Sequence, residues 1–277
     1  MARIVYSRFF RINSYHNNSR YDSKPATTSS VIFSMNRKHS QHFISFLCIF
    51  LIWWAVSIIL NMPIVPTPLD TIKFTFKHFK DSLYLHIIYS TIRILVSTAL
   101  SLLLALPTGI LMGYFIRIDN ILSPFIYFLY PIPKVALTPI IMLIFGIGDL
   151  SKVIIIFIII YFQIVVSVRD SVKNIQPEML DFAISAGAGF IDIARWVLLP
   201  ASLPGILTSI RVSMATSLSV LFFTETFGTE YGIGYLIMDS WIRVNYVEMY
   251  SGILSLALLG LFFFAAIGIF EKLLCKF

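Results

Sequence analysis

Residues 167–205 read SVRDSVKNIQPEMLDFAISAGAGFIDIARWVLLPASLPG and separate two strongly hydrophobic stretches. The first stretch covers residues 153–166, and the second begins near Ile206. A polar segment in this position must connect two membrane spans, because lipid-exposed irregular backbone is not tolerated in the hydrocarbon. We therefore expect an α-helical membrane protein with a substantial loop at about residues 169–205.

The loop has its own helix signals. Pro177 and Glu178 suit the first turn of a helix, since a proline there loses no hydrogen bond and an acid complements the helix dipole. Gly187 favours a helix stop. A second short helix is expected over residues 190–199, ended by Pro200, because a proline disfavours helical geometry in the residue before it. The sequence thus predicts a helix-turn-helix element at the membrane surface.

The loop resembles the cytoplasmic coupling loop of permease subunits of ABC importers, which carries the pattern EAA, three residues, G, nine residues, I, one residue, LP. The matching residues are Asp181, Phe182, Ala183, Gly187, Val197, Leu199 and Pro200. Two positions depart from the pattern, because Asp181 replaces a glutamate and Phe182 replaces an alanine. The proline-rich residues 131–152 also resemble the third span of the nitrate, sulfonate and taurine branch of these importers.

This resemblance implies a type I permease fold with about six transmembrane helices in a bacterial or archaeal cell membrane. It also implies two separate ATPase subunits, an extracytoplasmic solute-binding protein, and pairing with a second copy or a related chain. The solute would be a small anion such as nitrate, a sulfonate or taurine; a thiamine precursor or another nitrogenous solute is the alternative. ATP and Mg²⁺ would bind only the ATPase partner, so this chain would be no enzyme and hold no cofactor.

Composition supports a membrane protein. Of the 277 residues, 58% are hydrophobic and only 13% are charged, as expected for several apolar spans. The net charge of +7 does not indicate nucleic-acid binding, since the basic residues alternate with apolar runs. Cys48 and Cys275 are far apart and the five histidines are scattered, so neither a disulfide nor a metal site is expected.

Residues 1–42 contain one acidic residue and no apolar periodicity, which predicts a disordered basic tail. A transit peptide is an alternative, and Met35 is a further candidate for the true start. Residues 43–277 are expected to form the permease domain. Its predicted spans are Phe43–Leu60, His86–Gly113, Ile121–Phe145, Val153–Val168, Ile206–Phe227 and Met249–Phe270.

Orientation follows from the positive-inside rule. When the N-terminus is placed in the cytoplasm, most of the 21 Lys and Arg residues fall on the cytoplasmic side. Both termini and the loop are therefore expected there. The third span holds four prolines, which are tolerated in a membrane only where neighbouring helices or a water-filled cavity satisfy the freed backbone groups.

The sequence contains no GxxxxGK[ST] phosphate loop and no recognisable catalytic constellation. Energy for transport must then come from a partner. A channel, a secondary transporter or an integral-membrane enzyme are the alternatives from other classes, although none of them needs so structured a loop.

Two sets of residues are candidates for a translocation path. The first is a polar stripe on one face of the fifth span, which either lines the path or satisfies its hydroxyls within the helix bundle. Its members are Ser209, Ser213, Ser217 and Thr224. The second set comprises the ionisable residues Arg93, Lys134 and Glu225, which are costly at membrane depth and therefore functional candidates. Arg93 and Glu225 lie near span ends, where snorkelling is the alternative.

Overall fold

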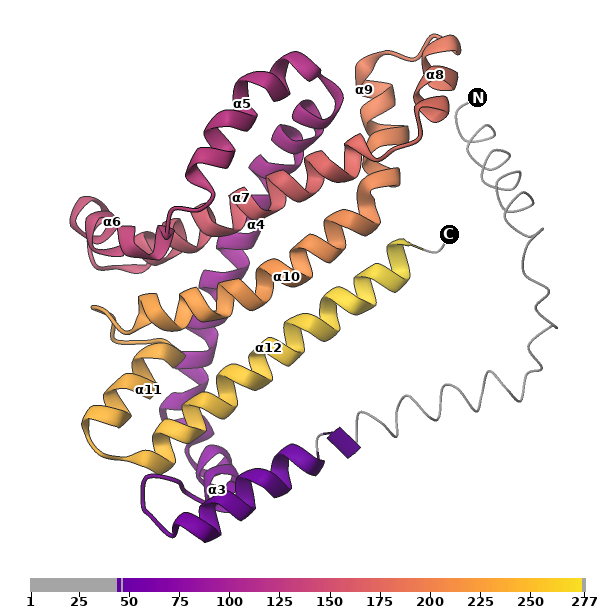
Figure 1. The fold of residues 1–277 in the computed structure, drawn as a ribbon. Coiled ribbons are helices and arrows are strands. Elements are labelled where there is room, and N and C mark those ends of the chain that lie inside the picture. The colour runs from indigo at the N-terminus through magenta and orange to yellow at the C-terminus, as the bar shows by residue number, and fades with distance from the viewer. Residues whose placement is uncertain (1–43, 46, 276–277) are drawn as a thin grey trace, which may run out of the picture. The chain divides into compact units, whose positions relative to one another are not determined.

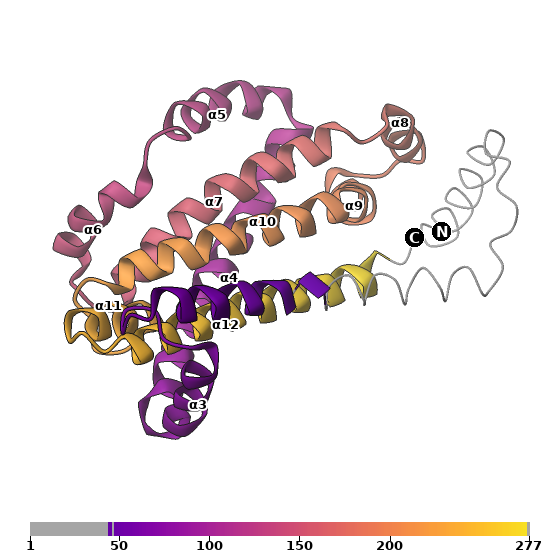
Figure 2. The same cartoon turned by 60° about the horizontal axis from the view of Figure 1, so that its bottom comes forward.

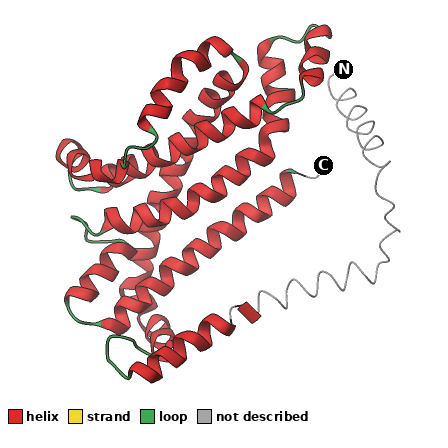
Figure 3. Cartoon of the chain, viewed as in Figure 1, coloured by secondary structure: helices red, strands yellow, loops and turns green. Residues whose placement is uncertain are grey.

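The computed structural model describes residues 44–45 and 47–275, and every regular element within these residues is a helix (Figures 1 and 3). The predicted all-α fold class is therefore confirmed. The predicted tail of residues 1–42, including a start at Met35, lies outside the described residues.

The chain divides into two compact units, Met1–Pro68 and Leu69–Phe277. In the first unit the apolar helix Leu47–Leu60 is followed by a turn, in which the Ser57 hydroxyl donates to the Val65 carbonyl at 2.9 Å. This helix occupies the predicted first span but has fewer than 18 described residues.

Four stretches within the described residues are long and apolar enough to cross a membrane, and a bent helix pair makes a possible fifth. The four are Pro68–Tyr114, Asp149–Lys173, Phe190–Glu225 and Tyr246–Leu274. Their principal helices are α4 (Tyr84–Tyr114), α7 (Asp149–Lys173), α10 (Leu199–Glu225) and α12 (Tyr246–Leu274). In both views α10 lies between α7 and α12 (Figures 1 and 2). The helices α4, α7, α10 and α12 correspond, in this order, to the predicted second, fourth, fifth and sixth spans.

The α4 and α7 helices approach each other closely because α4 presents small residues to α7. A β-carbon added to Gly109 would lie 2.6 Å from Val168 Cβ, and one added to Gly113 would lie 2.5 Å from Val172 Cβ. Further along the seam, the Ser97 hydroxyl lies 3.1 Å from the Val153 carbonyl of α7. Small and hydroxyl-bearing side chains at such contacts are typical of helix packing in membranes.

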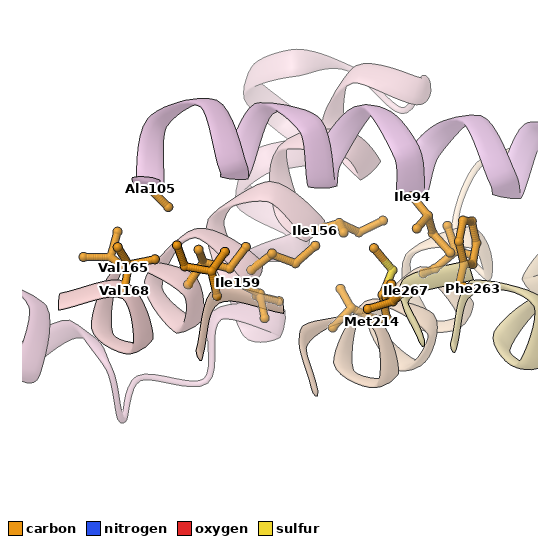
Figure 4. Packing of buried hydrophobic residues seen from close by; sticks show 14 of the residues in the cluster. Ile94, Ala105, Ile156, Ile159, Val165, Val168, Met214, Phe263 and Ile267 are labelled. Atoms are coloured by element: carbon orange, nitrogen blue, oxygen red, sulfur yellow. The ribbon is translucent and has the colours of Figure 1, made fainter. Parts of the chain in front are cut away.

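The apolar core is centred on α7. Ile156, Ile160 and Val168 of α7 have no exposed surface, and they pack in one cluster with Ile94 of α4 and Met214 of α10. Figure 4 shows Ile156 of α7 between the helices near Ile94 and Met214, with Phe263 of α12 on the far side of Ile94. Burial of one helix by two neighbours explains why the α7 sequence is apolar almost all round.

The predicted third span is not one continuous helix. It consists of α5 (Ile116–Leu129), a 3₁₀ turn (Lys134–Leu137) and α6 (Thr138–Phe145), and its two arms are bent by 78°. Pro131 and Pro133 lie in the break between them, where their missing N–H groups and fixed φ angles prevent an uninterrupted helix. The prolines therefore break this span rather than merely kink it.

Two predicted boundaries also change. The helix α5 begins at Ile116, five residues before the predicted start of the third span at Ile121. The helix α7 begins at Asp149, four residues before the predicted start of the fourth span at Val153. An additional helix, α11 (Ile233–Ile242), lies between α10 and α12 and was not predicted. It is too short to give a membrane-span signal.

Candidate functional site

The loop between α7 and α10 forms the predicted first helix. This helix, α8 (Pro177–Ser185), has Pro177 in its first turn and Glu178 beside it. In both views α8 and α9 (Phe190–Ile193) lie at one end of α7 and α10, and α6 lies at the other end (Figures 1 and 2).

A Schellman motif ends α8 at Gly187. The Gly187 N–H donates to the Ile184 carbonyl at 2.9 Å, and the Ala188 N–H donates to the Ala183 carbonyl at 3.1 Å. Gly187 has a φ of +79°, which L-amino acids with side chains rarely adopt, and no heavy atom lies within 4 Å of where its β-carbon would be. The glycine is thus required by the turn itself, and the space above it is open.

The prediction that Pro200 ends the second loop helix is wrong. The α9 helix continues through a π-helical turn (Ala194–Leu198) directly into α10, and Leu199 is helical with φ −63° and ψ −49°. Pro200 lies in the first turn of α10, where the wider π turn precedes it and its missing N–H is tolerated. The returning arm of the loop is therefore one continuous helical segment with the membrane span.

The seven motif residues divide between an inner and an outer surface. Ala183 and Val197 pack against the apolar core, whereas Asp181 and Phe182 are exposed. Leu199 is also exposed and Pro200 is half-buried. The side chain of Ile191, outside the motif, is 78% exposed. The loop thus presents an apolar surface with a few acidic groups, which is suited to contact with another protein.

At the opposite end of α7, Arg93 and Glu225 form a buried ion pair rather than snorkelling to solvent. The Arg93 Nη1 donates to Glu225 Oε1 at 2.6 Å, and both side chains are almost completely buried. The Ser90 hydroxyl donates to Glu225 Oε1 at 2.8 Å, and the Gly234 N–H donates to Oε2 at 2.8 Å. Arg93 Nε also donates to Asp149 at 2.8 Å. This ion cluster joins α4, α7, α10 and α11.

Lys152 is a further buried cation that the sequence analysis did not single out. It is completely buried, and its ammonium group donates to the carbonyls of Ile147, Gly148 and Gly228 at 2.8, 3.3 and 3.3 Å. It thereby ties the turn before α7 to the turn after α10. The sequence signal that could have found it was a lysine at the edge of an apolar run. A lysine inside a membrane span is costly and therefore a functional candidate.

An open recess of about 540 Å³ lies beside this cluster. Its lining includes Arg93, Asp149, Glu230 and two stacked tyrosine rings, Tyr89 and Tyr231. The recess is at the end of α7 opposite to the loop.

The polar stripe of α10 faces the interior of the chain. Ser209, Ser217 and Thr224 donate to carbonyls of their own helix at 2.8, 2.6 and 3.0 Å. Ser213 is also buried, and its hydroxyl has no hydrogen-bond partner among the described residues. The bonds of Ser209, Ser217 and Thr224 agree with the alternative in which hydroxyls are satisfied within the helix bundle. That these residues line a translocation path stays a prediction.

Lys134 lies at the break between α5 and α6. Its ammonium group donates to the carbonyls of Leu129 and Tyr130 at 3.0 Å each, at the end of α5, and lies 4.9 Å from the centre of the Phe162 ring. A cation at this position complements the helix dipole and satisfies carbonyls that the break leaves free. Lys134 therefore stabilises the bend, and no described carboxylate pairs with it.

Comparison with known families identifies the protein class. Residues 105–275 match the model of the binding-protein-dependent transport system inner membrane component family. The chain belongs to this family. It is thus a membrane-spanning transport permease and a multi-pass membrane protein, as its apolar helices independently indicate.

Relatives of the permease include two transporters named for sulfur-containing solutes. The taurine transport system permease protein TauC of Escherichia coli is 28% identical over 217 residues, which cover 76% of this chain and 79% of TauC. The aliphatic sulfonates transport permease protein SsuC of Bacillus subtilis is 28% identical over 220 residues, with 79% of each chain covered.

The formylaminopyrimidine transport permease protein ThiX of Halalkalibacterium halodurans is a further relative of this permease. It is 26% identical over 230 residues, which cover 83% of this chain and 92% of ThiX.

The fold also matches a solved structure. An inward-facing structure of the MetNI methionine ABC transporter contains a chain that superposes with a TM-score of 0.63 at 19% identity, covering 69% of this permease and 95% of that chain. The resemblance to ABC importer permeases, inferred from the loop motif, is thereby confirmed at the level of both family and fold.

The ion cluster leads to a stability prediction. Arg93→Met leaves Glu225 buried without its cation, and breaking a buried pair in this way costs about 3–5 kcal/mol. Thermal unfolding of the detergent-solubilised variant should therefore show a much lower unfolding temperature than the wild-type permease. The double variant Arg93→Met/Glu225→Met should recover much of it, because no unpaired buried carboxylate then remains.

Arg243→Met is the matched control. Arg243 pairs with Asp239 and Glu248 at the surface, where an exposed pair contributes at most about 1 kcal/mol. Equal losses for Arg93→Met and Arg243→Met would contradict the role assigned to the buried pair.

Proposed function

We propose that this permease is one half of a homodimer that forms the translocation path of an ATP-driven importer. Two ATPase subunits bind its loops on the cytoplasmic side, where both chain termini also lie. A binding protein delivers the solute on the other side. ATP and Mg²⁺ bind the ATPase subunits, and the permease itself contributes no cofactor or catalytic group.

The continuous helix from α9 into α10 carries this proposal. A force applied to the loop passes into a membrane span without crossing a flexible joint, because Phe190–Glu225 is a single helical stretch. The exposed side chains of Phe182 and Ile191 provide an apolar surface for the ATPase subunit to grip. Closure of the ATPase pair would then move the spans and alternate the access of the path.

The solute class follows from the relatives. TauC and SsuC are named for taurine and aliphatic sulfonates, so we assign a small organic sulfonate to this permease. The similarity to ThiX supports a formylaminopyrimidine as the alternative. Both solutes would be captured first by the binding protein, which sets the specificity of the complete transporter.

A transport assay tests this function. Proteoliposomes that contain the permease, its ATPase and its binding protein should accumulate labelled taurine or an alkanesulfonate only when ATP is supplied on the ATPase side. Accumulation of a formylaminopyrimidine instead would select the alternative solute. ATP-independent uptake by the permease alone would indicate a channel or secondary transporter and overturn the proposal.

The path itself is assigned to the exposed face of α10. Thr208, Val212, Ala215 and Ser219 recur three or four positions apart and are exposed in the single chain, so they share one face of the helix. The buried stripe described above lies on the other side. In a homodimer, the exposed face is the one available to line a path between the two copies.

Cysteine labelling distinguishes the two faces. In a background in which Cys48 and Cys275 are replaced, Ser219→Cys in the assembled transporter should react with a water-soluble maleimide. Ser217→Cys is the control, since Ser217 is completely buried only two residues away, and it should react far more slowly. Labelling of Ser219→Cys by lipid-soluble reagents alone would place this face against lipid instead.

Gly187 provides a test of coupling. Gly187→Leu should assemble but lose most of the ATPase stimulation by solute-loaded binding protein, because leucine strains the left-handed turn and fills the open space above it. Gly187→Asn should keep a large part of the stimulation, since asparagine tolerates positive φ. Wild-type stimulation in Gly187→Leu would contradict the coupling role.

A further inference from the structure

An ionic clasp joins α5, the first arm of the broken span, to the end of α7. We define the clasp as Asp119 of α5 with Arg169 and Lys173 of α7. Arg169 Nε lies 2.6 Å from Asp119 Oδ1, and Lys173 Nζ lies 2.5 Å from Asp119 Oδ2. The Asp119 side chain is only 6% exposed, and the Ser123 hydroxyl also donates to it at 2.6 Å.

Arg169 makes a second attachment about two turns further along α5. Its Nη1 donates to the Tyr127 hydroxyl at 2.7 Å, and its guanidinium lies 5.5 Å from the centre of the Tyr127 ring. Asp119, Ser123 and Tyr127 are spaced by four residues and therefore share one face of α5. The clasp thus holds α5 over two helical turns rather than at a single point.

The α7 side of the clasp leads directly into the loop. Lys173 is the last residue of α7, and only residues 174–176 separate it from α8. This connection is stiff, because the Asn174 N–H donates to the Asp170 carbonyl at 3.1 Å and the Ile175 side chain is buried. The loop therefore has two rigid connections to the bundle, one into α10 and one through α7.

Only part of α5 packs within the chain, through Ile126, which is 7% exposed and belongs to the core cluster. Ile121, Phe125 and Phe128 are 64%, 65% and 76% exposed, so much of its apolar surface does not pack within the chain. The position of α5 relative to α7 consequently depends on the clasp as well as on apolar packing. Burial strengthens this dependence, since charges shielded from water interact more strongly than exposed ones.

We propose that Asp119 is a positioning residue that makes the broken span follow the end of α7 when the loop moves. This inference rests on the proposed function, in which ATPase subunits pull on the loop. One carboxylate of α5 pairs with two cations of α7, so its removal leaves Arg169 and Lys173 without an acidic partner on α5. When α7 moves, α5 would then no longer move with it. The bend at Lys134, at the end of α5, would also stay behind.

The test uses the complete transporter in proteoliposomes and measures the solute imported per ATP hydrolysed. Asp119→Asn should assemble and keep the basal ATPase rate, but the imported solute per ATP should fall about tenfold, the factor by which losing one hydrogen bond to a charged group typically changes an equilibrium. Asp119→Glu should restore a large part of the coupling ratio. A purely structural residue would change the amount of assembled transporter without changing this ratio.

Asp170→Asn is the matched control. Asp170 also contacts Arg169, at 3.3 Å, but it lies on α7 itself and its side chain is 53% exposed, so it does not join α7 to α5. It should leave the ratio unchanged. An unchanged ratio in Asp119→Asn, or an equal fall in Asp170→Asn, would overturn the proposal.

A covalent clasp keeps the proposal testable if Asp119→Asn fails to assemble. Asp119→Cys and Lys173→Cys, in a background in which Cys48 and Cys275 are replaced, should retain coupling after cross-linking with a short bis-methanethiosulfonate, which replaces the length of the lost side chains, because the two ends move together. Loss of coupling on cross-linking with recovery on reduction would show that they must separate. If the wild-type complex shows no ATP-driven uptake, the proposed function fails instead.

Discussion

Close approach of α4 and α7 is the contact on which the rest of the permease depends. Hydrocarbon gives little hydrophobic driving force between apolar helices, so their association relies on tight packing and on satisfied polar groups. Gly109 and Gly113 leave room for the side chains of Val168 and Val172. Ser101 adds a polar contact, since its hydroxyl lies 3.1 Å from the Phe157 carbonyl of α7. With this seam fixed, α10 packs on α7, and α12 packs on α10 and α11.

Charge is then placed at the two ends of α7 rather than in its middle. At one end Arg93 and Glu225 pair within the bundle, and Lys152 is satisfied by backbone carbonyls. At the other end Arg169 and Lys173 hold Asp119. Because buried charges are stable only when paired and hydrogen-bonded, each cluster fixes how several helices meet. The central part of α7 is free to be almost wholly aliphatic.

The loop is built as an extension of this bundle. Its first helix begins at Pro177 and ends at the left-handed Gly187, and its second arm runs into α10 without interruption. The broken span contrasts with this arrangement, because its two arms meet at a bend of 78° that Lys134 stabilises. The fold thus combines stiff connections at the loop with one span that its prolines break and bend.

Much of the architecture was determined by the sequence alone. Long apolar runs specify membrane helices because lipid offers backbone groups no other partners, and the positions of Pro177 and Gly187 specify the ends of α8 because their backbone requirements are local. The loop motif likewise identified the family. Short elements such as α11 (Ile233–Ile242) carry no such signal, because an apolar helix of this length is common to many environments.

Only the tertiary structure decided how the polar residues are used. The helical spacing of Ser209 to Thr224 predicted one shared face of α10, but spacing cannot tell whether that face is buried within the chain, and the structure shows that it is. Arg93 and Glu225 are separated by 132 residues in the chain, so no local pattern could show that they pair instead of snorkelling. Pro200 is accommodated by a preceding π turn, which depends on packing rather than on its neighbours in sequence. The sequence thus determines local backbone preferences, whereas the pairing of buried charges is determined only when distant helices pack together.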